Sequence, residues 1–514
     1  MSITSQQKKI ITPLSILLSP KRMNDSTLFH HPQFNMQYKT MQTFYDLFPT
    51  HFEQHIKSPG VVLDLVNANL QLRGMILTNK AMPCIKVSIS RLDVFTTLIQ
   101  TQWRLKVHTV CFTLHGVTAN MLAQFKNAKT AIFTKAELSP QFVQTQTPLS
   151  FPNLQTLILH QSDIDNPSDH FLDLFLTLKS FSSNQNNTQL LQCMFRSNKI
   201  STIEQLRVIH SKSYMIHPVI YTNRPLPPHA FIFFQNLKLL HLHHVQIQSF
   251  QRFLAEIPNI QHITLSEFAS DEPYFIPSLA ELQTLSLNRV TVMEIHTPMP
   301  KLTNLMLSHV LDLEVLDTIP SLKFLHISHC NELRFLYCSA TEKIVIEDTN
   351  ITAHELSSPV KHLTYNNILY MPVNMLSYKK YVTERITLKD VALITNFHQV
   401  PPNTIITLND CHVELQQIPT NNVIRSLNIT NMNIHNFSFM FNAESLTLRK
   451  TKIFSPIYWN LFSKIKTLRI VDTTLPPTCY HIEHLKRCNA VHLDTVTMPN
   501  EVEEQFKQIT FTRV

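Results

Sequence analysis

The stretch FPNLQTLILHQSDI, residues 151–164, contains an apolar pattern that recurs through most of the chain. Leu157 and Leu159 are two positions apart, and Ile164 follows five positions after Leu159. Apolar residues at alternate positions indicate a strand with one buried face. Later copies begin 18 to 23 residues apart, at Leu240, Ile263, Leu285, Leu305, Leu325, Ile344, Leu363, Ile386, Ile406, Leu427, Leu446, Leu468, Val491 and Ile509. A fixed period of this size predicts a solenoid, because each turn buries its apolar face only by stacking on its neighbours.

Copies before residue 151 keep the same phase with less regular residues. Their three core positions are Leu63/Leu65/Leu70, Ile85/Val87/Leu92, Val110/Phe112/Val117 and Ala131/Phe133/Leu138. Between Leu157 and Leu206 the gap is 49 residues, so one copy is either unreadable or replaced by an insertion. Segment 165–200 has apolar residues at helical spacing followed by a polar loop, which indicates a helix and a surface loop.

The domain organisation follows from these breaks. A second long gap contains four prolines and predicts another irregular insertion near residues 214–232. Neither break changes the composition enough to indicate separate domains. We therefore expect an N-terminal segment with a helical cap over 1–59, one solenoid over 60–498, and a capping helix and strand over 499–514.

Prolines indicate how each turn returns to the next strand. Several copies have an apolar residue and a proline ahead of the first core residue, at Phe151-Pro152, Ile257-Pro258, Met299-Pro300, Ile319-Pro320 and Val400-Pro401. Proline cannot donate a ladder hydrogen bond, so it belongs before the strand. With roughly 20 residues per turn and a strand of about five, the return has little room for a full helix. We expect the outer side to be extended or 3₁₀-like.

The repeat resembles that of the leucine-rich-repeat family over about residues 60–514. Five positions after the first core residue, that family usually has Asn, sometimes Cys or Thr, which hydrogen-bonds the turn. Here the column reads Ser162, Val245, Val290, Val310, Cys330, Thr349, Val391, Cys411, Met432, Thr451, Thr473 and Val496. The chain thus resembles a divergent subtype without the asparagine ladder. The resemblance implies an α/β, β-rich, right-handed solenoid with a curved parallel sheet on its concave face and short irregular or 3₁₀ convex returns. It also implies a non-enzymatic scaffold that binds a partner protein through the concave face.

Glycine usage excludes several classes of enzyme. The chain has three glycines, and none follows Gly116. Phosphate-cradling loops need glycine for close backbone approach, so a Walker loop, a Rossmann fingerprint and a kinase glycine loop are absent. The G-x-S-x-G elbow of many hydrolases is absent for the same reason. We expect no enzyme activity and no cofactor.

Charge and cysteine usage suggest a location and a kind of partner. The net charge is +8, from scattered basic residues, which favours solubility and an acidic partner. Eight cysteines form no CxxC pair, and Cys330 and Cys411 fall at core positions, as suits a reducing compartment. No apolar run approaches the ~20 residues that cross a bilayer, and no signal-peptide cleavage site is readable. We expect a cytoplasmic location, with the nucleus as an alternative, and no membrane association.

Histidines give the strongest indication of a metal site. His241 and His243 share one strand face, His262 lies on the adjacent turn and His160 on an earlier one. Turns about 4.8 Å apart can bring imidazoles around a zinc ion. No acidic residue has a readable spacing that would support them, and solvated histidines on the concave face explain the pattern. We therefore expect no bound metal.

Outward strand positions carry the candidate binding residues. They are mostly small hydroxyl and amide side chains, which suit either a solvated sheet face or a wet protein interface. Basic residues join them towards the C-terminus. The candidate partner-binding residues are Thr364, Arg385, Thr387, Lys389, Asn409, Thr447, Arg449 and Arg469, facing an acidic segment of another protein. Nucleic acid is not expected, because the basic residues are sparse and no aromatic residues alternate with them.

Residues 44–56, FYDLFPTHFEQHI, allow a second functional hypothesis. They resemble the opening of an F-box, although Phe48 lies between Leu47 and Pro49 and departs from that pattern. Proteins of that family couple an F-box to leucine-rich repeats and present substrates to a ubiquitin ligase. The resemblance implies a Skp1-like adaptor as partner. A plain N-terminal capping helix is the other interpretation of the segment.

The C-terminal segment PNEVEEQFKQITFTRV follows the last full copy of the repeat. Asn500 is a good helix N-cap residue, and Glu503 stands three positions later as in a capping box. These residues predict a helix over 501–507, with Phe506 in the inward slot that leucine occupies elsewhere. A final strand at Ile509–Phe511 is expected to close the sheet.

Overall fold

The structure is a computed structural model that describes residues 62–63 and most of residues 85–508. The larger gaps in the described part are 139–150, 163–176, 185–201, 210–235, 245–253, 268–273, 370–381, 392–402, 412–422 and 436–442. The F-box-like segment 44–56, the 214–232 insertion, most of the 165–200 insertion and the final strand therefore lie outside the described residues, and those hypotheses stay predictions.

Two compact units divide the chain, residues 1–237 and residues 238–514. The first unit contains a parallel sheet in which each strand pairs with the next. Its strands are β1 (Val62–Leu63), β2 (Ile85–Ile89), β3 (Val107–Phe112), β5 (Thr130–Thr134), β7 (Thr156–His160), β8 (Ser180–Ser183) and β9 (Gln205–Ile209).

The second unit contains a longer parallel sheet of the same kind. The first core residues of successive turns stand side by side in it, as Leu285 does with Leu305. Its strands are β10 (Leu239–His243), β11 (His262–Ser266), β13 (Thr284–Asn288), β15 (Asn304–Ser308), β17 (Phe324–Ser328), β19 (Lys343–Glu347), β21 (Val360–Ile368), β22 (Val382–Val391), β23 (Ile405–Asn409), β24 (Ile424–Thr430), β26 (Ala443–Arg449), β29 (Thr467–Val471) and β31 (Ala490–Asp494).

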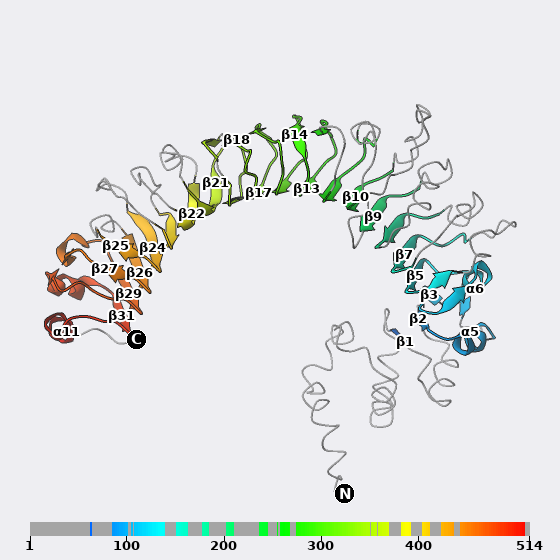
Figure 1. The fold of residues 1–514 in the computed structure, drawn as a ribbon. Helices are drawn as coiled ribbons and strands as arrows, with labels where there is room; N and C mark the ends of the chain where they lie inside the picture. Colours follow the sequence, from blue (N-terminus) through cyan, green and yellow to red (C-terminus); the bar gives the residue numbers. More distant parts are fainter. Residues whose placement is uncertain are drawn as a thin grey trace, which may run out of the picture. The chain divides into compact units, whose positions relative to one another are not determined.

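Short elements form the outer side of the turns in the second unit. The main sheet follows the inner side of the curve of this unit and the short strands follow its outer side (Figure 1). We call the exposed face of this main sheet the concave face. The outer elements are β12 (Tyr274–Ile276), β14 (Val292–Ile295), β16 (Val315–Leu316), β18 (Phe335–Cys338), β20 (Ala353–Leu356), β25 (Asn433–Ile434), β27 (Lys452–Ile453), β28 (Ile457–Tyr458), β30 (Cys479–Tyr480) and the 3₁₀ turns η7 (Trp459–Leu461) and η8 (Ile482–Arg487). The expected extended and 3₁₀ returns are confirmed here.

In the first unit the returns differ from the extended or 3₁₀-like form expected from the sequence. Its outer elements include helices α5 (Leu92–Ile99) and α6 (Ala119–Ala123), beside the short strands β4 (His115–Val117) and β6 (Glu137–Leu138). The Thr118 side chain accepts a hydrogen bond from the Met121 N–H at 3.3 Å and caps α6. The turns that contain α5 and α6 span 23 residues from Val87 to Val110 and 21 residues from Val110 to Ala131, so short helical segments fit within turns no longer than those of the second unit.

The core lies between the main sheet and the outer elements. The two predicted core residues are buried in the strands of the second unit from β10 to β29, as for Leu240 and Leu242 or Leu427 and Ile429, whereas Val491 and Leu493 of the last strand β31 are half-buried. Residues two apart on a strand point to the same side, so the alternation read from the sequence is confirmed. No helix in the described part of the chain is long and apolar enough to cross a membrane.

The predicted register of β2 is wrong by two residues. Val87 stands beside Val110, and Ile89 beside Phe112, so Val87 and Ile89 are the core pair instead of Ile85 and Val87. The expected third core residue, Leu92, is 61% exposed at the start of α5. Three alternate apolar residues in IKVSI fit two registers equally well, and the stacking on β3 selects one of them.

The repeat that seemed unreadable between Leu157 and Leu206 is present as β8. Phe181 stands beside Leu157, and Ser183 stands beside Leu159 in the second core column. Ser183 is fully buried, so a hydroxyl occupies a position that is apolar in other turns. Because Ser183 is polar, the apolar pattern of the repeat could not be recognised in the sequence at this turn.

The C-terminal helix α11 (Asn500–Lys507) is confirmed, but its predicted start is wrong. Pro499 occupies the N-cap, no side chain caps the helix, and Asn500 is its first residue. Glu503, expected in a capping box, pairs instead with Lys507 at 2.7 Å. Phe506 is buried as predicted, with its ring 6.1 Å from that of Trp459 in an edge-to-face arrangement.

Candidate functional site

The concave face brings most of the predicted binding residues into register. Thr364 stands beside Thr387, Lys389 beside Asn409, and Thr447 beside Arg469 on neighbouring strands. The threonines and the asparagine are half-buried, whereas the four basic side chains are exposed. The half-buried Thr and Asn side chains thus form a polar sheet surface, which we call the floor of the concave face, and the basic side chains project from it.

The basic residues on this face differ in their ion pairs. Lys389 lies 3.7 Å from Asp390, and both side chains are about half exposed, so the pair contributes little to stability. Among the residues that the structure describes, none forms an ion pair with Arg385, Arg449 or Arg469. These three guanidinium groups keep their positive charge available to a ligand.

A row of left-handed residues forms the edge of the concave face, one at the end of each strand of the main sheet. Their φ angles lie close to +50°, although none is glycine. In most described turns the N–H of this residue donates to the last strand carbonyl of the next turn, as His329 does to Glu347 at 3.0 Å. We call these residues the edge row: His244, Glu267, Arg289, His309, His329, Asp348, Asn367, Asp390, Asp410, Asn431, Lys450, Asp472 and Thr495. In the first unit, Lys135 and Gln161 adopt the same conformation after β5 and β7.

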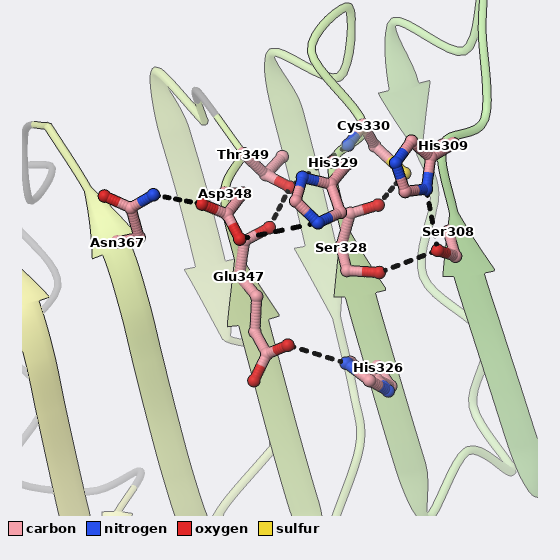
Figure 2. A network of polar contacts seen from close by, with 10 residues as sticks. All are labelled: Ser308, His309, His326, Ser328, His329, Cys330, Glu347, Asp348, Thr349 and Asn367. Atoms are coloured by element: carbon pink, nitrogen blue, oxygen red, sulfur yellow. Dashed lines mark hydrogen bonds and ion pairs between the residues drawn. The ribbon is translucent and has the colours of Figure 1, made fainter.

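Side chains of the edge row contact one another from turn to turn. Figure 2 shows the central part, where the His309 and His329 rings stack with centroids 4.3 Å apart. His329 Nε2 lies 3.6 Å from Asp348 Oδ2, and the Asn367 amide donates to the Asp348 carboxylate. Burial lowers the pKa of His309, and the neighbouring His329 and Arg289 lower it further.

The strand ends next to the edge row carry a second set of polar contacts. Ser328 Oγ donates to Ser308 Oγ at 3.0 Å, and His326 Nε2 lies 3.5 Å from Glu347 Oε2 (Figure 2). The Glu347 carboxylate is therefore already occupied by a histidine of the preceding turn. The centre of the concave face is a hydrogen-bonded network, in contrast to the unpaired arginines nearer the C-terminus.

Buried hydroxyl groups replace the asparagine ladder beneath the edge row. Thr349 Oγ1 donates to the Glu347 carbonyl at 2.7 Å and accepts from the Cys330 N–H at 3.3 Å. Ser162 makes the equivalent contacts with the His160 carbonyl and the Ala136 N–H. One hydroxyl thus joins two turns, which is the role that asparagine has in the family that the repeat resembles.

The buried thiols are not suited to nucleophilic chemistry. Burial raises the pKa of Cys330 to about 11 and that of Cys338 to about 12. A thiol is a nucleophile only as its thiolate, so both are inert at neutral pH. The six cysteines in the described part of the chain are free.

The four histidines considered as metal ligands from the sequence do not gather into one cluster among the described residues. The structure instead places His243 beside His244 and Glu267, with their ligand atoms all within 4.8 Å of one another. A more exposed cluster contains His481, Glu483 and His484. Sequence reasoning missed His244 and Glu267 because both belong to the edge row, whose turn conformation was not predicted. The sequence did contain a signal for the edge row, because the residue after each strand is often His, Asp or Asn.

The strands, their register and the buried columns define the class of the fold. The described part of the chain is a β-rich parallel solenoid with few helices, consistent with a leucine-rich-repeat-like fold.

Comparisons with known proteins add one structural similarity. No family model matches the chain, and no curated protein sequence matches it. One solved structure that resembles it is a leucine-rich-repeat protein of Leptospira interrogans, at 13% sequence identity and a TM-score of 0.32. The match covers 89% of this chain and 96% of that one.

Proposed function

We propose that the protein is a non-enzymatic scaffold that binds an acidic segment of a partner protein on the concave face of residues 238–514. The observation that carries the proposal is the set of exposed arginines without ion pairs, Arg385, Arg449 and Arg469, above a polar sheet floor. Charged groups at an interface accelerate association and select the partner more than they add affinity. A carboxylate-rich segment is the complementary ligand.

The floor of the concave face supports the same proposal. Thr387, Asn409 and Thr447 offer hydroxyl and amide groups that can donate to or accept from an extended chain. Interfaces of this kind are wet and polar, with about one hydrogen bond per 100–200 Å². We place the interaction in the cytoplasm or nucleus, where the free cysteines described above would stay reduced.

Site-specific photocrosslinking in cell extract tests the location of the interface. A photoreactive residue at Thr467, exposed on β29 of the concave face, should capture one protein, and the captured peptide should be rich in Asp and Glu. The same group at Glu355, exposed on the outer strand β20, is the matched control and should not capture that protein. Equal capture from both positions, or capture from Glu355 alone, would place the interface elsewhere.

A further inference from the structure

We propose that His243, His244 and Glu267 form a binding site for a divalent transition-metal ion such as Zn²⁺. All three lie in the first two turns of residues 238–514 and are half-buried. Two imidazoles and one carboxylate are a ligand set that Zn²⁺ commonly uses, with further positions left to water. The site is separate from the basic concave surface and does not depend on the proposed partner binding.

The backbone holds the three ligands in place. His244 and Glu267 both belong to the edge row, with φ angles of 53° and 50°. The His244 N–H donates to the Ser266 carbonyl at 2.9 Å, and the Glu267 N–H donates to the Asn288 carbonyl at 2.8 Å. His243 stands beside Ser266 on the paired strands β10 and β11. Three consecutive turns therefore fix the positions from which the ligands project.

Arg289 orients the Glu267 carboxylate by contacting the oxygen that does not contact His244. Glu267 Oε1 accepts from Arg289 Nη1 at 3.0 Å, while Oε2 lies 2.6 Å from His244 Nε2. An outer partner of this kind fixes the orientation of a metal ligand. Around a tetrahedral Zn²⁺ with bonds of about 2.0–2.1 Å, neighbouring ligand atoms lie about 3.3 Å apart. The His244–Glu267 pair therefore needs to open by less than about 1 Å to admit the ion.

The spacing of the three side chains favours the same site. One ligand atom from each of His243, His244 and Glu267 lies within 4.8 Å of the other two, so a single ion can contact all three. Lowering the pH should weaken binding, because protons compete with a metal ion for imidazole nitrogens.

Titration of the metal-free full chain with Co²⁺ and with Zn²⁺ tests the proposal. Co²⁺ should give the visible absorption of a low-symmetry site with nitrogen and oxygen ligands, and Zn²⁺ should displace it. The variants His243→Asn, His244→Asn and Glu267→Gln use residues that other turns carry in the same columns, namely Asn288, Asn367 and Gln161. Each should fold normally and weaken the tightest binding event by about 100-fold, because even outer partners of metal ligands contribute 10- to 100-fold.

Two controls separate this site from the other histidines of the chain. Glu347→Gln breaks a histidine–carboxylate pair that belongs to no three-ligand cluster, and His481→Ala removes a ligand of the exposed cluster. Both should leave the tightest event unchanged. The proposal is overturned if the wild-type chain binds no ion tightly, or if the three ligand variants bind like wild type. Loss in His481→Ala alone would also overturn it.

Discussion

At the scale of single residues, buried hydroxyl groups hold successive turns together. Thr349 joins its own turn to the preceding one through the Glu347 carbonyl and the Cys330 N–H. Valine occupies the same column at Val290 and Val310, so the column accepts the shape of valine without the hydrogen bonds. The chain lacks an asparagine ladder, but in the turns that carry Thr or Ser a hydroxyl group makes the hydrogen bonds that join successive turns.

Thr349→Val should therefore destabilise the protein by about 1–3 kcal/mol, because the Cys330 N–H is left buried without its acceptor. Thr407→Val, at a half-buried position of the concave face, is the control and should change the free energy of unfolding by less than about 0.5 kcal/mol. Urea-induced unfolding measures both. A Thr349 variant as stable as wild type would mean that the hydroxyl is not a link between turns.

A buried histidine makes stability depend on pH. His354 on β20 hydrogen-bonds the Tyr365 hydroxyl on β21 across the core, at 2.8 Å, and burial lowers its pKa to about 3. In the unfolded chain the imidazole takes up a proton near pH 6.5. Below that pH the unfolded state binds a proton that the folded state excludes, so stability falls until about pH 3 and is unaffected above pH 6.5.

Because the pKa of His354 is lowered this far, the free energy of unfolding should be about 2 kcal/mol smaller at pH 5 than at pH 7.5. The variant His354→Leu, combined with Tyr365→Phe, removes the titrating group and its polar partner. Denaturant melts between pH 5 and pH 7.5 give the slope of the unfolding free energy against pH for each protein. The difference between the two slopes does not depend on the absolute stability of either protein. Parallel pH profiles would show that His354 is charged or solvated in the folded state.

At the scale of the elements, strand register decides which side chains are buried. The alternation Leu-x-Leu was enough to predict the core columns of the second unit, because leucine and isoleucine fill them almost without exception. It was not enough for β2, where three alternate apolar residues allow two registers, or for β8, where Ser183 replaces an apolar residue. The edge row was not predicted either, because left-handed residues other than glycine leave only a weak trace in one sequence.

A pair of neighbouring substitutions in β24 tests the register. Leu427 is 3% exposed, and Leu427→Asp would bury an uncompensated carboxylate and cost several kcal/mol, roughly 3 or more. Asn428 points to the concave face, where Asn428→Asp should cost less than about 0.5 kcal/mol. Denaturant melts would refute this register if the two variants were equally destabilised.

The strand ends offer a test of the edge row. Lys450 has a φ angle of 50°, and Lys450→Gly should raise stability by up to about 1 kcal/mol, because glycine adopts this conformation without strain. Lys452, two residues later in the outer strand β27, is the matched control. Lys452→Gly should lower stability by roughly 0.5–1 kcal/mol, since glycine weakens a strand. Thermal unfolding that ranks the two variants in the reverse order would contradict the turn conformation.

At the scale of the whole molecule, the candidate site depends on repetition. No single strand carries a recognisable motif, and the basic surface arises because Arg385, Arg449 and Arg469 recur on one face of stacked turns. The sequence was sufficient to place these residues on that face. It could not show which charges are paired. Lys389 and Asp390 are adjacent in the sequence and would point to opposite faces of an extended strand, but Asp390 has a φ angle of 51° and its carboxylate lies 3.7 Å from the Lys389 ammonium group.

Binding of the protein that is captured from Thr467, measured against salt concentration, tests the central claim most directly. Arg449→Glu together with Arg469→Glu should weaken the complex by at least about tenfold and flatten its salt dependence, with the thermal melt unchanged. The control combines Arg334→Glu with Lys452→Glu, which remove the same positive charge from exposed outer positions, and it should bind like wild type. Equal affinity of the two double variants for the partner would contradict binding through the concave face.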